Sequence, residues 1–285
     1  IEYITGIFGE AEFPEYKVYV DGANGAISAV IRPVYEALGI KADYRGMDPD
    51  GININDDCGS LHPEFLGEVL KEDETGILFD GDADRCLFVL SGSRLIDGDM
   101  LMALNSEKML TCGRLKGSKV VATVMSNLGF EEYLKRRNIS LDRTRVGDKY
   151  VLERMLKTGS VLGGEQSGHI IFLDRSTTGD GLITSLETLN TLEKLGQSLD
   201  GFLKAFPVYP QLLENVPVSD KKSVMECEKI KSRLSELEER EDLRIVLRPS
   251  GTESFIRVMV EGIDSVEVDS VTRELVEIVQ ECSNG

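Results

Sequence analysis

Hydrophobic and polar positions along the first half of the chain repeat one pattern. A short β-rich run is followed by a glycine or polar turn and then by an amphipathic stretch with helical spacing. The first cycle predicts these elements in order: strand 17–22, helix 23–40, helix 62–73, strand 76–79, strand 86–90 and helix 97–110. The last of these helices opens with aspartates, as the helix dipole favours.

A second cycle of the same kind follows. It predicts strand 119–124, helix 130–138, strand 141–146, helix 148–157 and helix 179–196. Strands that alternate with helices of this length indicate α/β layers with a parallel or mixed sheet. The predicted fold class is therefore α/β, with two consecutive three-layer α/β/α domains with mixed sheets at 1–97 and 98–206.

The pattern changes at 207–217, where three prolines fall within eleven residues. Beyond this stretch, one predicted helix carries Val224, Cys227, Ile230, Leu234 and Leu237 on one face. Two β-rich runs follow, at 243–247 and 254–262, and then a final amphipathic helix. These elements predict a small α+β C-terminal domain at 207–285.

Charge and cysteine content limit the classes of partner. The 285 residues hold 32 Lys and Arg against 50 Asp and Glu, a formal net charge of −18, which argues against nucleic acid or an anionic membrane as a partner. No apolar run approaches 18 residues, so no membrane span or signal peptide is expected. Five scattered cysteines without CxxC spacing suggest reduced thiols in a cytoplasmic protein, rather than a disulfide framework or a zinc site.

The stretch LFDGDADRCLFVL places Asp80, Asp82 and Asp84 at every second position after a β-rich run. Such close carboxylates raise one another's pKa or need a cation. An EF-hand is excluded because its sixth and twelfth positions would be Arg85 and Ser91. A phosphatase-type D-x-D would not need the third carboxylate, and a solvated acidic turn is the plain alternative. Three oxygens from an extended segment suit Mg²⁺, with Arg85 available for a phosphoryl oxygen.

Two further stretches are candidates for ligand contacts. In LGGEQSGHIIF, Glu165 and Ser167 suit vicinal sugar hydroxyls, and His169 suits proton transfer. The alternative is a glycine-rich hairpin whose polar residues face solvent.

The second of these stretches is RIVLRPSGTESFIRV. Two arginines, turn amides and hydroxyls make an anion cradle there, or else an ordinary hairpin loop. The cradle residues are Arg248, Ser250, Gly251, Thr252 and Arg257.

Together the three stretches resemble the α-D-phosphohexomutase superfamily, over nearly the whole chain. DGDADR is similar to its metal loop, GEQSGH to its sugar-binding loop and RPSGTES to its phosphate-binding loop. PDGININDDCGSLHPE and TRVGDKYVLE are most similar to the phosphoglucosamine mutase branch. The resemblance implies that sugar 1- and 6-phosphates interconvert through a phosphoserine and a bisphosphate, with Mg²⁺ on the three aspartates.

One feature of the family is not found in these 285 residues, a T-A-S-H-N-P-like loop carrying the catalytic serine. The resemblance therefore implies the second, third and fourth domains, with the first supplied in cis or in trans. We expect the 285 residues alone to be inactive, with Arg85 and His169 as catalytic residues beside the absent serine. Hexose or hexosamine phosphate is the expected ligand, and homo-oligomerisation is left open. The alternatives are a phosphoglucomutase or phosphomannomutase, or a non-catalytic sugar-phosphate-binding fragment.

Overall fold

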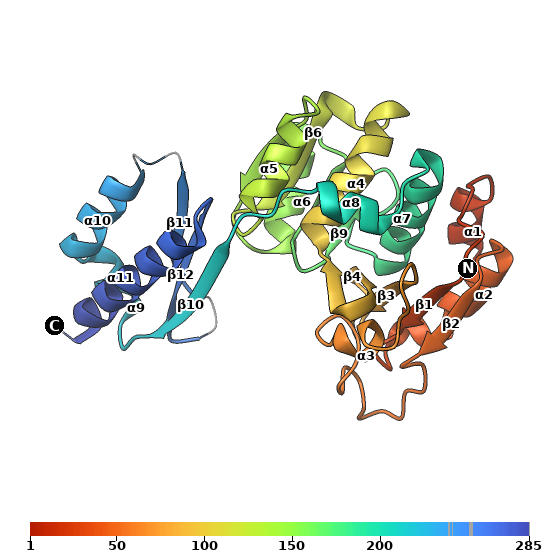
Figure 1. Cartoon of the computed structure of the whole chain (residues 1–285), viewed down its shortest axis with the longest axis horizontal. Coiled ribbons are helices and arrows are strands. Elements are labelled where there is room, and N and C mark those ends of the chain that lie inside the picture. Colours follow the sequence, from red (N-terminus) through yellow and green to blue (C-terminus); the bar gives the residue numbers. More distant parts are fainter. Residues whose placement is uncertain (239, 241, 251–252, 285) are drawn as a thin grey trace. The chain divides into compact units, whose positions relative to one another are not determined.

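A computed structural model describes residues 1–238, 240, 242–250 and 253–284 (Figure 1). The chain forms two compact units. The first comprises Ile1–Ser126 and Tyr133–Phe206, and the second comprises Asn127–Glu132 and the residues from Pro207 onward. The division into three domains stays a prediction, because both large sheets belong to the first unit.

The first sheet of unit 1 has five strands in the order β2-β1-β3-β4-β5. They are β1 (Val18–Asp21), β2 (Ala42–Arg45), β3 (Thr75–Phe79), β4 (Cys86–Leu90) and β5 (Arg94–Ile96). β1 runs parallel to β2 and β3, whereas β4 runs antiparallel to β3 and β5. Every residue of β3 and β4 is buried, so the hairpin that they form lies inside the unit.

The second sheet of unit 1 has the order β7-β6-β8-β9 and is also mixed. Its strands are β6 (Lys119–Thr123), β7 (Ser140–Thr144), β8 (Leu162–Gly164) and β9 (Ile170–Phe172). The predicted fold class, with two mixed α/β sheets and a small C-terminal domain, is confirmed. The short strands β2, β5, β8 and β9 were not separated by the hydrophobic pattern.

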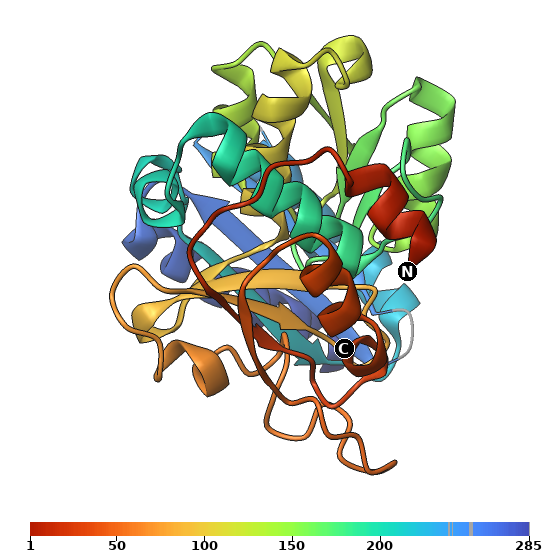
Figure 2. The same cartoon turned by 90° about the vertical axis from the view of Figure 1, so that its right-hand side faces the viewer.

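Helices α4 (Gly98–Thr111) and α7 (Gly181–Leu195) pack against each other and contact strands of both sheets. Asn105 of α4 donates to Thr188 of α7 and accepts from Thr191, with all three side chains buried. The N-terminal segment lies beside α7, where Asn190 donates to the Glu12 carbonyl (Figure 2). The helices within residues 1–206 are α1 (Glu2–Phe8), η1 (Ala26–Ala29), α2 (Ile31–Ala37), α3 (Glu64–Gly67), η2 (Ser91–Ser93), α4 (Gly98–Thr111), η3 (Lys116–Ser118), α5 (Leu128–Lys135), α6 (Asp148–Thr158), α7 (Gly181–Leu195) and α8 (Leu199–Ala205). Residues 128–132 of α5 belong to unit 2.

Two predicted helices are shorter than the pattern suggested. The helix predicted at 23–40 starts late, because Ala23 and Asn24 have positive φ and form a turn. The helix predicted at 62–73 is the single turn α3, since Lys71 and Glu74 close a turn of their own. In both places local polar hydrogen bonds replace the helical ladder.

Unit 2 contains an antiparallel sheet in the order β10-β12-β11. Its strands are β10 (Gln211–Pro217), β11 (Leu243–Pro249) and β12 (Phe255–Gly262), and its helices are α9 (Lys221–Glu226), α10 (Glu228–Glu238) and α11 (Ser265–Asn284). A core of aliphatic side chains, including Val224, Ile230, Ile256 and Leu275, joins the helices to the sheet. The helix predicted across 224–237 is broken at Cys227, whose ψ of 123° is extended.

The cysteines correct one prediction. Cys227 and Cys282 form a disulfide that connects the start of α10 to the last turn of α11. Cys58, Cys86 and Cys112 are free thiols. The expectation of reduced thiols throughout is wrong, because chain folding brings together two sulfurs that are 55 residues apart in sequence. Among the described residues, none of the helices has the length and hydrophobicity that a bilayer crossing requires.

Candidate functional site

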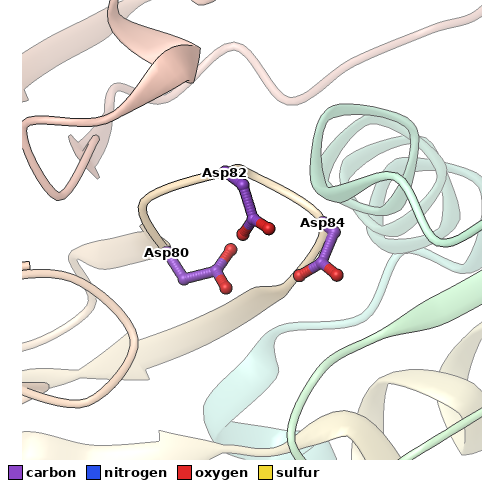
Figure 3. A group of neighbouring side chains, drawn as sticks. All are labelled: Asp80, Asp82 and Asp84. Atoms are coloured by element: carbon purple, nitrogen blue, oxygen red, sulfur yellow. The ribbon is translucent and has the colours of Figure 1, made fainter. Parts of the chain in front are cut away.

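The β3–β4 hairpin of unit 1 carries the three predicted metal ligands at its tip. The side chains of Asp80, Asp82 and Asp84 point toward one another, as Figure 3 shows, and one oxygen of each lies within 4.8 Å of the others. Asp80 is 2% exposed, whereas Asp82 is open to solvent. Three convergent carboxylate oxygens are a donor set for a hard cation such as Mg²⁺ or Ca²⁺. The residues present therefore fit the predicted metal.

The loop is a turn rather than the extended segment expected from the sequence. The N–H of Ala83 donates to the Asp80 carbonyl, and Ala83 has a φ of +62°. The Arg85 guanidinium holds the Asp80 carboxylate through an Nε–Oδ2 hydrogen bond of 2.6 Å, and the Arg85 backbone N–H donates to Oδ1 at 3.1 Å. The turn brings the carboxylates together, and Arg85 fixes the most buried of them.

Other segments of unit 1 hold the backbone of this loop. The N–H of Ala26 donates to the Gly81 carbonyl at 2.8 Å, and the N–H of Gly181 donates to the Ala83 carbonyl at 2.9 Å. A Cβ at Gly25 would overlap the Gly81 backbone, so only glycine allows this approach. The stretch GANGA at 22–26 therefore supports the predicted metal loop.

His169 connects the predicted sugar-binding loop to the predicted metal loop. Its Nδ1 lies 3.0 Å from Asp84 Oδ2, and its Nε2 accepts from the Gly179 N–H at 3.2 Å. Because Nε2 accepts, the ring proton lies on Nδ1 and is donated to Asp84. Arg85 and His169 also form a β-bridge. The predicted proton transfer by His169 stays a prediction, since both ring nitrogens bond to the chain itself.

Gly179 is a site residue that the sequence reasoning missed. A Cβ at this position would collide with the imidazole of His169, so the close contact requires glycine. The Gly-Asp-Gly run at 179–181, where α7 begins, is the sequence signal for this position. Asp180 does cap α7, accepting from the Ile183 N–H at 3.0 Å.

The β8–β9 hairpin presents the rest of the sugar-binding loop. Ser167 is exposed at its tip, whereas Glu165 is half-buried and accepts from the Gly147 N–H at 2.9 Å. Gln166 donates to Asp97 at 3.1 Å. Burial raises the pKa of Asp97, which also caps α4. Glu165 and His169 thus lie in the β8–β9 hairpin, which His169 joins to the predicted metal loop. Gln166 anchors the same hairpin to the start of α4.

Unit 2 contains the predicted anion cradle. Arg248 of β11 and Arg257 of β12 are direct cross-strand partners, so both side chains leave the same face of the sheet. Two like charges opposite each other repel, and a bound anion would relieve that repulsion. Glu253 offers Arg257 a distant contact of 3.7 Å.

The turn between β11 and β12 is closed by its own backbone. The Ser250 N–H donates to the Phe255 carbonyl at 2.9 Å, and Ser250 Oγ accepts from the Glu253 N–H at 3.3 Å. Ser250 is 4% exposed. Two predicted cradle residues, Gly251 and Thr252, lie outside the described residues.

Comparison with known proteins connects both units to one family. Residues 97–209 match the model of phosphoglucomutase/phosphomannomutase alpha/beta/alpha domain III, and residues 213–278 match the model of the phosphoglucomutase/phosphomannomutase C-terminal domain. Phosphoglucosamine mutase of Thermosipho africanus is 43% identical over 99% of this chain and 65% of its own length. That of Thermotoga neapolitana is 45% identical over 97% of this chain and 64% of its own length.

Solved structures share the fold at lower identity. Aspergillus fumigatus N-acetylphosphoglucosamine mutase, crystallised with GlcNAc-6P and magnesium, has a TM-score of 0.83 and 20% identity over 97% of this chain and 68% of its own. A phosphoglucomutase/phosphomannomutase family protein from Burkholderia thailandensis has a TM-score of 0.83 and 21% identity over 100% of this chain and 64% of its own. The chain belongs to the phosphohexomutase superfamily. It spans about two thirds of the length of its phosphoglucosamine mutase relatives.

Proposed function

We propose that this chain is the metal- and sugar-phosphate-binding part of a phosphohexomutase that interconverts glucosamine 6-phosphate and glucosamine 1-phosphate. The observation that carries the proposal is the convergence of Asp80, Asp82 and Asp84 beside the hairpin that holds Glu165 and His169. The similarity to phosphoglucosamine mutases over nearly the whole chain supports this substrate class. We place such an enzyme in the cytoplasm.

The residues of the metal loop prepare it for phosphoryl transfer. Asp80, Asp82 and Asp84 would hold Mg²⁺, which when bound supplies positive charge to a transferring phosphoryl group. Arg85 orients the Asp80 carboxylate and adds a fixed cation next to the loop. His169 orients Asp84 through Nδ1, and Gly179 keeps the imidazole in that position.

The sugar and its second phosphate are assigned to the remaining predicted residues. Glu165 and Ser167 would contact the sugar hydroxyls, since a carboxylate accepts and a hydroxyl both donates and accepts. Arg248 and Arg257, with Ser250, Gly251 and Thr252, would bind the phosphate that is not transferred. The phosphoserine would come from the part of the family's length that these 285 residues do not span, in cis or in trans.

A binding experiment tests the cradle. Titration calorimetry with glucosamine 6-phosphate should show at least a tenfold weaker complex for Arg248→Ala, because a hydrogen bond to a charged group is worth about 1.5–3 kcal/mol. Arg273→Ala is the matched control, since Arg273 is an exposed arginine of the same unit that pairs with Asp269 of its own helix, α11. Equal affinity of wild type and Arg248→Ala would exclude the cradle.

A turnover experiment tests the reaction. The 285-residue chain alone should form no glucosamine 1-phosphate from glucosamine 6-phosphate, and a covalently joined or added serine-containing segment of a relative should restore turnover. Turnover by the chain alone would refute the assignment of the nucleophile. Binding without turnover in any combination would favour the alternative of a non-catalytic sugar-phosphate-binding protein.

A further inference from the structure

Lys221, the first residue of α9, reaches the turn that joins β11 to β12. Its Nζ donates to the Ser250 carbonyl at 2.7 Å and to the Glu253 carbonyl at 3.0 Å. Ser250 follows the last residue of β11 and Glu253 comes shortly before β12. Ser250 is also bonded to Phe255 and Glu253 in this turn. One ammonium group therefore joins both arms of the predicted anion loop.

The position of Lys221 is fixed from both sides. The Asp220 carboxylate caps α9 by accepting from the Lys222 and Ser223 N–H groups. Val224 of α9 is 1% exposed and belongs to the core of unit 2. The segment before α9 is also joined to the turn, because the Val218 N–H donates to the Ser254 carbonyl at 3.0 Å.

The contact with Glu253 has a consequence for the peptide group that follows it. In a trans peptide the C=O and N–H point in opposite directions, and the described residues contain no cis peptide. A Glu253 carbonyl that faces Lys221 therefore turns the Ser254 N–H away from the lysine. Amides aligned in this way in a turn are the donors of an anion site.

We propose that Lys221 is a positioning residue of the anion-binding loop, which holds the Ser250 and Glu253 carbonyls so that the Ser254 N–H faces a bound phosphate group. Lysine suits this position because its three donors serve both carbonyls, whereas an apolar side chain would join neither of them. This inference rests on the proposed function, since it takes the loop as the site of the non-reacting phosphate. It adds a residue outside the RPSGTES stretch.

The test compares four forms of the full 285-residue chain: wild type, Lys221→Met, Lys221→Arg and Lys222→Met. Lys222 is the matched control because this neighbouring lysine is exposed, and its ammonium group lies 3.9 Å from Glu226 rather than at the turn. Calorimetry with glucosamine 6-phosphate should show about tenfold weaker binding for Lys221→Met, because binding must then order about one more residue of the turn. Lys221→Arg should recover most of the affinity, and Lys222→Met should equal wild type.

Amide hydrogen exchange of residues 250–256 without ligand supplies the second measurement. It should be faster in Lys221→Met than in the other three forms, while the amides of β12 beyond residue 257 stay protected. Equal exchange and equal affinity in all four forms would overturn the inference. Weaker binding with unchanged exchange would also overturn it, because Lys221 would then touch the anion directly. If wild type itself does not bind, or Arg248→Ala binds as well as wild type, the proposed function has failed instead.

Discussion

Glu187 of α7 provides a quantitative test of how unit 1 is held together. Its carboxylate is 1% exposed and receives hydrogen bonds from Arg114 at 2.8 and 3.0 Å, from Arg175 at 3.1 Å and from Lys108 at 3.2 Å. Burial alone would raise the pKa of Glu187, but the three cations outweigh it and lower the pKa to about 2. The charged carboxylate is therefore strongly favoured in the folded chain.

The contribution of this group to stability follows from its two pKa values. A carboxylate whose pKa is lowered by folding stabilises the fold above its unfolded pKa, and the stabilisation is lost as the pH falls through the folded pKa. The pKa of Glu187 falls from 4.5 in the unfolded chain to about 2 in the folded one. This shift contributes about 3 kcal/mol to the free energy of unfolding at pH 7. The contribution should fall to about 1.4 kcal/mol at pH 3.

Urea unfolding followed by far-UV circular dichroism measures this contribution. Glu187→Gln should lower the free energy of unfolding by about 3 kcal/mol at pH 7, in the range for breaking a buried ion pair. The difference from wild type should shrink between pH 4.5 and pH 2. Glu193→Gln is the control, because Glu193 is exposed on the same helix. This substitution should change the free energy of unfolding by less than about 0.5 kcal/mol. A difference independent of pH, or one below about 1 kcal/mol at pH 7, would refute the reasoning.

Three shorter predictions concern the loops and the disulfide. Asp82→Asn should weaken Mg²⁺ binding in calorimetry because it removes one of three convergent charges, and unchanged binding would contradict the metal site. Alkylation under denaturing, non-reducing conditions should label three of the five cysteines, and five labelled thiols would rule the disulfide out. Reduction of the Cys227–Cys282 bond, which closes a 55-residue loop, should lower the stability of unit 2 by about 4 kcal/mol. Gly179→Ala should shift the imidazole NMR signals of His169 but not those of His62. An unaltered spectrum would show that Gly179 and the His169 ring are not in close contact.

The hydrophobic pattern predicted the elements that are buried along their whole length. Strands 76–79 and 86–90 and the helices near 97–110 and 179–196 are found within one or two residues, because burial dictates apolar side chains at nearly every position or on one face. The pattern missed β2, β5, β8 and β9, which are too short to show a period. It also extended helices into segments where local polar hydrogen bonds form turns.

In the candidate site, too, features set by neighbouring residues could be predicted, whereas features set by contacts with distant residues could not. Asp80, Asp82 and Asp84 could be found because they are neighbours in sequence, and carboxylates so close together have few explanations. The left-handed conformation of Ala83 could not be predicted, because its carbonyl is held by the N–H of Gly181, which is distant in sequence. Lys221 gives no sequence signal either, because its partners are main-chain carbonyls about 30 residues away.

The six residues DGDADR at the tip of the β3–β4 hairpin depend on much of unit 1 for their shape. Ala26 and Gly181 bond to the carbonyls of this loop, and the N–H of Cys86, which follows it, donates to the Gly168 carbonyl at 3.1 Å. Closing these contacts requires chain loops of roughly 50–100 residues, which form late when a protein folds. A chain released from the ribosome before residue 179 would contain every predicted metal ligand, yet it would lack the helix start and the imidazole neighbour that arrange them. The predicted cation site should thus take its final shape only after α7 has docked.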